Sequence, residues 1–171
     1  MISISDSLLE SVKINEGFNP QVYKCSMGFN TIGYGLNLDV ASNQTLKEVI
    51  CESVKNGNFN IDDNFNVELS KLKVNQEWAS DWLKNRLTEI DKQLSKNEVY
   101  NNLRIEYKEV LIEMAYQLGI NGLMKFKRMW KALENINIRG ANLDAHKEAL
   151  DSNWHKQTPS RAEKVASGFL K

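Results

Sequence analysis

The chain has 171 residues, of which 42% are hydrophobic and 26% charged, with two prolines and nine glycines. This length is enough to bury roughly two-thirds of the unfolded surface, which excludes a disulfide-stapled miniprotein, and the composition excludes a disordered chain. The apolar runs are far too short for a membrane span, and the first residues lack the basic start and apolar core of a signal peptide. We therefore expect a protein that folds in a cytoplasm and keeps its two cysteines, Cys25 and Cys51, reduced.

Charge is unevenly distributed although the net charge is zero. Residues 113–171 carry ten Lys or Arg against six Asp or Glu, so this third has a net charge of +4 and the rest of the chain has −4. A basic region of this kind can face nucleic acid, an anionic membrane or an anionic polymer such as a cell wall, or it can be an ordinary solvated surface. Composition alone does not choose between these alternatives.

Helical periodicity covers most of the chain. Ser5 and Asp6 are candidate N-caps of the first predicted helix, and Asn43 is a candidate N-cap of the second. Gly119 is a candidate C-cap that ends the helix beginning near Arg104. Cys51 lies in the apolar stripe of the second helix, so we expect it to be buried. The predicted helices span about 6–14, 43–56, 75–94, 104–119, 124–135, 143–151 and 160–168.

Only residues 18–40 break the helical pattern. They combine Pro20, three glycines and a β-prone Thr-Ile-Gly-Tyr run, which predicts a small antiparallel sheet with tight turns. The fold class is therefore α+β and mostly helical, in a single domain over residues 1–171. Within it we expect a first helix near 6–14, a small lobe over 14–73, a connecting helix over 74–94 and a helical lobe over 95–171. Clefts between lobes are favoured places for ligands.

Several residues near this sheet could carry chemistry. Glu16 follows the first helix between Ile14-Asn15 and Gly17-Phe18, and such a partly apolar setting suits a general acid because it disfavours ionisation. Gly33 and Gly35 are two positions apart, so on a strand they would leave one face of the backbone open to a substrate. Thr31 would share that face, where its hydroxyl could hold a water molecule. Taken singly, each residue also has an ordinary explanation: a solvated carboxylate, turn glycines and a β-prone threonine.

The joint spacing is more informative than any single residue. Glu16, eight residues, Cys25, five residues and Thr31 resemble the active-site signature of the phage T4-type lysozymes, glycoside hydrolase family 24. Residues 114–119 (MAYQLG) resemble the start of that family's second lobe, and residues 154–162 (WHKQTPSRA) resemble its motif near the C-terminus. Three motifs in the same order over nearly the whole chain make a chance match very improbable.

The resemblance implies a peptidoglycan muramidase that cleaves the β-1,4 bond between N-acetylmuramic acid and N-acetylglucosamine. It also implies the two-lobed lysozyme fold with its sugar cleft. Glu16 would protonate the leaving oxygen, Cys25 would take the position usually held by Asp, and Thr31 would help to place the attacking water. Candidate substrate-binding residues are Gly35, Tyr116 and Gln117. The motif residues Trp154, Gln157 and Arg161 would be mainly structural.

Cys25 is the informative departure from the common pattern. An ordinary thiol with a pKa of about 8.5 is only slightly ionised near neutrality, so some group must lower the pKa of this one. Lys24 is the nearest cation in the sequence, but strand alternation sends it to the opposite face, so we expect a helper distant in sequence. Leu36 stands where many relatives have a histidine, so an ion pair built on that histidine is absent.

The zero net charge also differs from the basic balance common among such lysozymes. Attraction to an anionic wall would depend on the basic cluster Lys125, Lys127, Arg128 and Lys131, which surrounds Phe126 and Trp130. No nucleic-acid motif accompanies this cluster. His146 and His155 lack neighbours at ligand spacing, so we predict no metal site, and we expect no cofactor.

The leading functional hypothesis is a phage endolysin that acts as a monomer on bacterial peptidoglycan, without binding nucleic acid or inserting into a membrane. It would accumulate in the host bacterial cytoplasm and reach the periplasmic cell wall through a separate membrane-permeabilising protein. Two alternatives remain open at this point: a non-catalytic wall-binding homologue with the same fold, and a bacterial antibacterial effector with the same activity.

Overall fold

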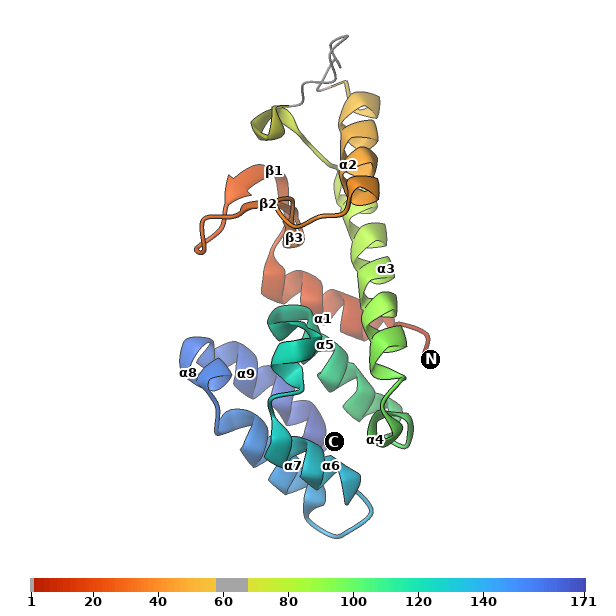
Figure 1. The fold of residues 1–171 in the computed structure, drawn as a ribbon, viewed down its shortest axis with the longest axis vertical. Helices are drawn as coiled ribbons and strands as arrows, with labels where there is room; N and C mark the ends of the chain where they lie inside the picture. The colour runs from red at the N-terminus through yellow and green to blue at the C-terminus, as the bar shows by residue number, and fades with distance from the viewer. Residues whose placement is uncertain (1, 58–67) are drawn as a thin grey trace. The chain divides into compact units, whose positions relative to one another are not determined.

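The computed structural model describes residues 2–57 and 68–171 and divides into two compact units (Figure 1). The N-terminal unit comprises Leu9–Lys84, and the C-terminal unit comprises Asn85–Lys171 together with the residues up to Leu8. Helices α1 (Asp6–Glu16) and α3 (Gln76–Leu94) each run from one unit into the other. Part of the predicted small lobe, residues 58–67, lies outside the described residues.

The N-terminal unit contains a three-stranded antiparallel sheet in the order β1-β2-β3, which confirms the sheet predicted within residues 18–40. Tyr23 lies opposite Thr31 across the first pair of strands, and Thr31 lies opposite Asn37 across the second. Ile32 and Leu36 on β2 and β3 are buried, so one side of the sheet contributes to the core. The strands are β1 (Asn19–Lys24), β2 (Asn30–Gly33) and β3 (Leu36–Asn37).

Helix α1 begins and ends at hydrogen-bonded termini. The Ser5 hydroxyl accepts a hydrogen bond of 3.1 Å from the Leu8 N–H, so Ser5 is the N-cap, as the sequence indicated. The helix continues two residues further than predicted, and Glu16 is its last residue rather than a residue beyond it. Gly17 then donates from its N–H to the Lys13 carbonyl at 2.9 Å, which closes the final turn.

Helix α2 (Asn43–Lys55) is capped by Ser42, whose hydroxyl accepts from the Thr45 N–H, and not by Asn43 as predicted. The prediction that Cys51 is buried was also wrong, because Cys51 is exposed. The face that α2 buries carries Val49, Glu52 and Ser53, and Glu52 is held there by amide groups from Asn56 and Asn75. Cys51 lies away from that face, which includes two polar residues besides Val49.

Helix α3 packs its predicted apolar face into the interior. Ala79 and Leu83 are fully buried, whereas the large rings of Trp78 and Trp82 on the same helix are only half-buried. Between α2 and α3 lies the short 3-10 helix η1 (Leu69–Lys71), which packs against β1.

The C-terminal unit is entirely helical in the part that the structure describes. Gly119 interrupts α5 with φ 72° and ψ 160°, so it ends the first helical run as predicted, and a further turn follows it. Helices α5, α7 and α9 and the 3-10 helix η2 pack around the fully buried Phe169. The short helices α4 and α8 were not predicted. The elements are α4 (Glu98–Asn101), α5 (Ile105–Leu123), α6 (Lys127–Glu134), α7 (Ala141–Leu150), α8 (Asn153–Gln157), α9 (Pro159–Ala166) and η2 (Ser167–Leu170).

The N-terminal residues are tied to this unit through a buried carboxylate. Asp91 on α3 accepts hydrogen bonds from the Tyr100 hydroxyl at 2.6 Å and from the Ile2 N–H at 3.0 Å. Burial, followed by the hydrogen bond and the negative charge of Asp91, raises the pKa of Tyr100, so its hydroxyl remains a donor. Among the described helices, none combines the length and apolarity needed to cross a lipid bilayer.

Candidate active site

The three predicted catalytic residues lie in the N-terminal unit, on consecutive elements. Glu16 is carried at the end of α1, Cys25 directly follows β1, and Thr31 lies within β2. Glu16 and Cys25 are partly exposed, whereas Thr31 is only 5% exposed. The first two side chains can therefore be reached by solvent, and the third is held against the protein.

Cys25 opens the tight turn that joins β1 to β2. Its N–H donates to the Phe29 carbonyl at 3.0 Å, and its carbonyl accepts from the Gly28 N–H at 2.8 Å. Gly28 has φ 82°, a conformation that glycine adopts without steric cost and that commonly closes three-residue hairpin loops. The turn therefore gathers several backbone N–H groups around the Cys25 side chain.

These N–H groups lower the pKa of the Cys25 thiol. Partial burial raises the pKa of the Cys25 thiol, but the hydrogen bonds to its sulfur lower it by more, so the pKa lies below the usual thiol value. The thiolate is correspondingly more populated near neutrality. The prediction of a helper distant in sequence was wrong, because the donors are local. They are the backbone N–H groups of Met27, Phe29 and Gly28 and the hydroxyl of Thr31.

Thr31 contacts the sulfur from the neighbouring strand. Its hydroxyl lies within hydrogen-bond reach of Cys25 and also 3.2 Å from the Phe29 carbonyl, to which it can donate. The Thr31 side chain is buried, and its strand β2 pairs with both β1 and β3, so its position is well defined. The catalytic role of Thr31 stays a prediction.

Sequence reasoning missed Tyr23. This residue lies directly opposite Thr31 and two positions before Cys25, so all three share one face of the hairpin. Burial first, and then the negative charges of Cys25 and Glu16, raise the pKa of the Tyr23 hydroxyl. Tyr23 thus lies close enough to both candidate catalytic groups to interact with them electrostatically. Strand alternation around Cys25 was the signal that could have found it.

The two glycines of the predicted open face are arranged differently from expectation. Gly33 is the last residue of β2, and a Cβ atom there would lie 3.3 Å from the Cβ of Ala79, so this glycine allows close packing against α3 rather than access for a substrate. Gly35 lies beyond the strand, in the turn before β3. The expectation that both project from one strand face was therefore wrong. A role for Gly35 in substrate binding stays a prediction.

The other two predicted substrate residues, Tyr116 and Gln117, lie on α5 in the C-terminal unit. The Gln117 side-chain carbonyl accepts a hydrogen bond of 2.7 Å from the indole N–H of Trp154, and its amide donates to the Thr158 hydroxyl at 3.3 Å. Because Trp154 is 3% exposed, this amide satisfies a buried donor. Gln117 therefore ties α5 to α8 and to the start of α9, and Tyr116 lies partly buried beside it.

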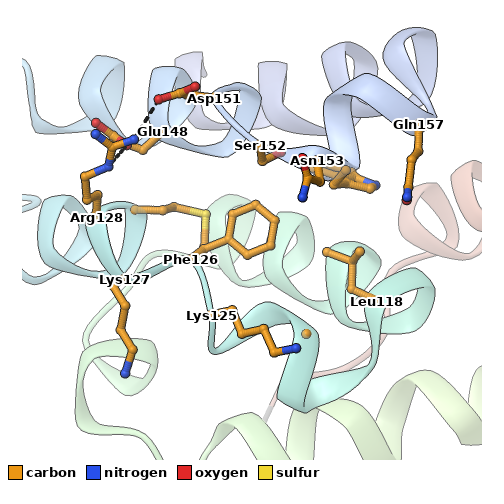
Figure 2. A pocket seen from close by; sticks show the side chains of 13 residues that line it. Leu118, Lys125, Phe126, Lys127, Arg128, Glu148, Asp151, Ser152, Asn153 and Gln157 are labelled. Atoms are coloured by element: carbon orange, nitrogen blue, oxygen red, sulfur yellow. Dashed lines mark hydrogen bonds and ion pairs between the residues drawn. The ribbon is translucent and has the colours of Figure 1, made fainter.

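A cavity of about 470 Å³ lies within the C-terminal unit, and Trp154 is one of the residues that line it (Figure 2). Figure 2 shows the Phe126 ring between Leu118 on one side and Arg128 on the other. Arg128 forms ion pairs of 2.8 Å with Glu148 and 2.6 Å with Asp151, both on the α7 side of the cavity. The two carboxylates balance the charge of Arg128, so the net positive charge of the predicted basic cluster is smaller than the sequence suggested. Its other members, Lys125, Lys127 and Lys131, are exposed.

Comparison with known proteins identifies the family. The model of the family described as phage lysozyme matches residues 13–170. The chain belongs to the phage lysozyme family.

Three relatives of this phage lysozyme family member share about a quarter of its residues. Two proteins from Dictyostelium discoideum, named probable T4-type lysozyme 2 and probable T4-type lysozyme 1, are each 27% identical to it. They match over 95% and 94% of this chain and over 93% and 92% of their own lengths. The pre-baseplate central spike protein Gp5 of Enterobacteria phage T4 is 24% identical over 96% of this chain and 28% of its own length. Membership in the family supports a hydrolase of the lysozyme type with peptidoglycan as its substrate.

Replacing Thr31 with valine should raise the pKa of the Cys25 thiol, because the substitution removes one of the hydrogen bonds that stabilise the thiolate. The ultraviolet absorbance of the thiolate, followed against pH in a Cys51→Ser background, should therefore rise at higher pH than in the parent. Ser26→Ala, an exposed change in the same turn, is the control and should leave the curve in place. Coincident curves for Thr31→Val and the parent would show that the hydroxyl does not bind the sulfur.

Gln117→Leu should destabilise the protein, because it leaves the buried indole N–H of Trp154 without its acceptor. The expected loss is ~1–3 kcal/mol in the free energy of unfolding, measured by urea denaturation. The matched control is Gln157→Leu at an exposed position, where the expected change is within about 0.5 kcal/mol. Equal stability of the two variants would contradict the structural role of Gln117.

Proposed function

We propose that this protein is a muramidase that hydrolyses the β-1,4 bond between N-acetylmuramic acid and N-acetylglucosamine in bacterial peptidoglycan. The observation that carries the proposal is the clustering of a carboxyl group, a sulfur with a lowered pKa and a buried hydroxyl around one hairpin. Family membership supports the same substrate class.

In the proposed reaction Glu16 is the general acid. It gives its proton to the glycosidic oxygen as the bond to the anomeric carbon breaks, which lets the sugar leave as an alcohol. The partly exposed position of Glu16 at a helix end gives a polysaccharide access to the carboxyl group.

Cys25 and Thr31 act on the water in this mechanism. The hydroxyl of Thr31 positions the water, the sulfur anion of Cys25 takes one of its protons, and the remaining hydroxide bonds to the anomeric carbon. The sulfur replaces the carboxylate that glycosidases generally use as their second group. The local N–H donors support this substitution, because they raise the fraction of sulfur that is ionised.

For the biological role we propose a phage endolysin. It would accumulate as a monomer in the host bacterial cytoplasm and reach the periplasmic wall through a separate membrane-permeabilising protein. The match to a family of phage lysozymes over residues 13–170 supports this role.

Glu16→Gln should abolish hydrolysis, with a loss of about 100-fold or more, because the amide cannot donate a proton to the leaving oxygen. The clearing of a purified peptidoglycan suspension measures the rate, and near-ultraviolet circular dichroism verifies the fold. Glu10→Gln on the same helix is the control, since Glu10 is exposed and forms a surface ion pair with Lys13. Clearing by Glu16→Gln at the parent rate would remove Glu16 from the mechanism.

Cys25→Asp should remain active, and Cys25→Ala should lose most of its activity, because a carboxylate can accept the proton of the water and a methyl group cannot. The same clearing assay applies. Cys51→Ala is the control, because this second cysteine is exposed on α2, and its activity should equal that of the parent. Unchanged turnover in Cys25→Ala would show that the sulfur takes no part in the reaction.

A further inference from the structure

Two aromatic side chains flank the candidate catalytic groups on one face of the hairpin. Tyr23 is the cross-strand partner of Thr31, and Phe29 is joined to Cys25 by the hydrogen bond from the Cys25 N–H. Residues directly opposite each other in an antiparallel pair point to the same side. The two rings and the sulfur therefore lie on the same side of the hairpin as the buried hydroxyl of Thr31.

Both rings are open to solvent. Tyr23 is 36% exposed and Phe29 is 41% exposed, whereas Tyr34 in the same sheet region is 2% exposed and packs against the ring of Phe18 at 5.4 Å. Tyr34 thus serves the core, and Tyr23 and Phe29 do not. A pair of exposed aromatic rings beside reactive polar groups is the usual lining of a ligand site.

The chemistry of this surface suits a pyranose ring. Aromatic faces attract the apolar C–H face of a sugar, and a phenol adds a polar end that can donate to a hydroxyl or an N-acetyl carbonyl. A tyrosine hydroxyl is protonated at neutral pH, and burial, followed by electrostatic interaction with Cys25 and Glu16, raises the pKa of Tyr23 further. Because Tyr23 is 36% exposed, a ligand can reach its hydroxyl.

We propose that Tyr23 and Phe29 form a sugar-binding subsite that holds an N-acetylated aminosugar ring next to the bond attacked at Glu16 and Cys25. This inference rests on the proposed muramidase function and adds the residues that position its substrate. Recognition is directed at the glycan and not at the peptides of the wall, because the surface pairs aromatic rings with a neutral hydrogen-bond donor.

Binding of peptide-free glycan strands, prepared from peptidoglycan with an amidase, tests the subsite in a Glu16→Gln background that does not consume the ligand. Tyr23→Leu and Phe29→Leu keep apolar bulk but lose the aromatic face, and each should raise the calorimetric Kd roughly five- to tenfold. Tyr23→Phe keeps the ring and should retain most of the affinity. Val40→Ala is the control, because Val40 is 75% exposed and follows the sheet outside the hairpin face.

Kinetics on intact peptidoglycan with Glu16 restored provide a second readout. Tyr23→Leu and Phe29→Leu should raise KM more than they lower kcat, which a general loss of structure would not do. Should Tyr23→Leu fail to fold, Tyr23→Val carries the same test with a residue suited to strands.

The outcomes separate the two proposals. Unchanged Kd and KM in folded variants of an active enzyme would overturn the subsite and leave the muramidase function standing. A parent that binds glycan through these rings but does not hydrolyse peptidoglycan would support the subsite and overturn the function.

Discussion

The candidate site depends on the turn that bends β1 into β2. Because Gly28 adopts φ 82°, the chain reverses within three residues, and the N–H groups of the turn converge on the Cys25 sulfur. A carboxylate at this position would be ionised at neutral pH without help, but a thiol would not. The backbone therefore provides the electrostatic support that makes a sulfur usable in place of a carboxylate. Thr31, on the paired strand, completes this support and is held in place by burial.

A second constraint organises the C-terminal unit. Gln117 receives the indole N–H of Trp154 and donates to the Thr158 hydroxyl, so residues of two separate sequence motifs form one buried contact. The ring of Phe126 meets Trp154 edge-on at 6.3 Å and lines the adjoining cavity. Gln117 and Trp154 lie far apart in the chain, and each satisfies the other's hydrogen-bonding group. These hydrogen bonds give Gln117 a structural role that does not depend on substrate binding.

The sequence predicted features that depend on local spacing and missed those that depend on tertiary packing. The sheet, the Ser5 cap and the helix end at Gly119 follow from local rules and were confirmed. Cys51 was placed in the core because its helix has an apolar stripe, yet the buried face includes Glu52 and Ser53, whose partners lie elsewhere in the chain.

The site shows the same division. The order of Glu16, Cys25 and Thr31 was sufficient to propose their joint role, but the donors to the sulfur are backbone groups, which no side-chain pattern reveals. Gly33 was assigned to an open face because the sequence does not reveal that α3 packs against the end of β2. Tyr23 was overlooked because strand alternation was applied to the glycines and not to the residue two positions before Cys25.

The turn at Gly28 also bears on how this loop can vary. No atom lies within 4 Å of where a Cβ at this position would be, so the restriction on residue 28 is one of dihedral angle and not of space. Asparagine and aspartate tolerate positive φ better than other residues, whereas β-branched residues do not. The exposed side chains of Ser26 and Met27 impose no comparable restriction, because the turn acts on the sulfur through main-chain groups such as the Met27 N–H. Substitutions at residues 26 and 27 can therefore change the surface of this loop while the main-chain hydrogen bonds around the sulfur persist.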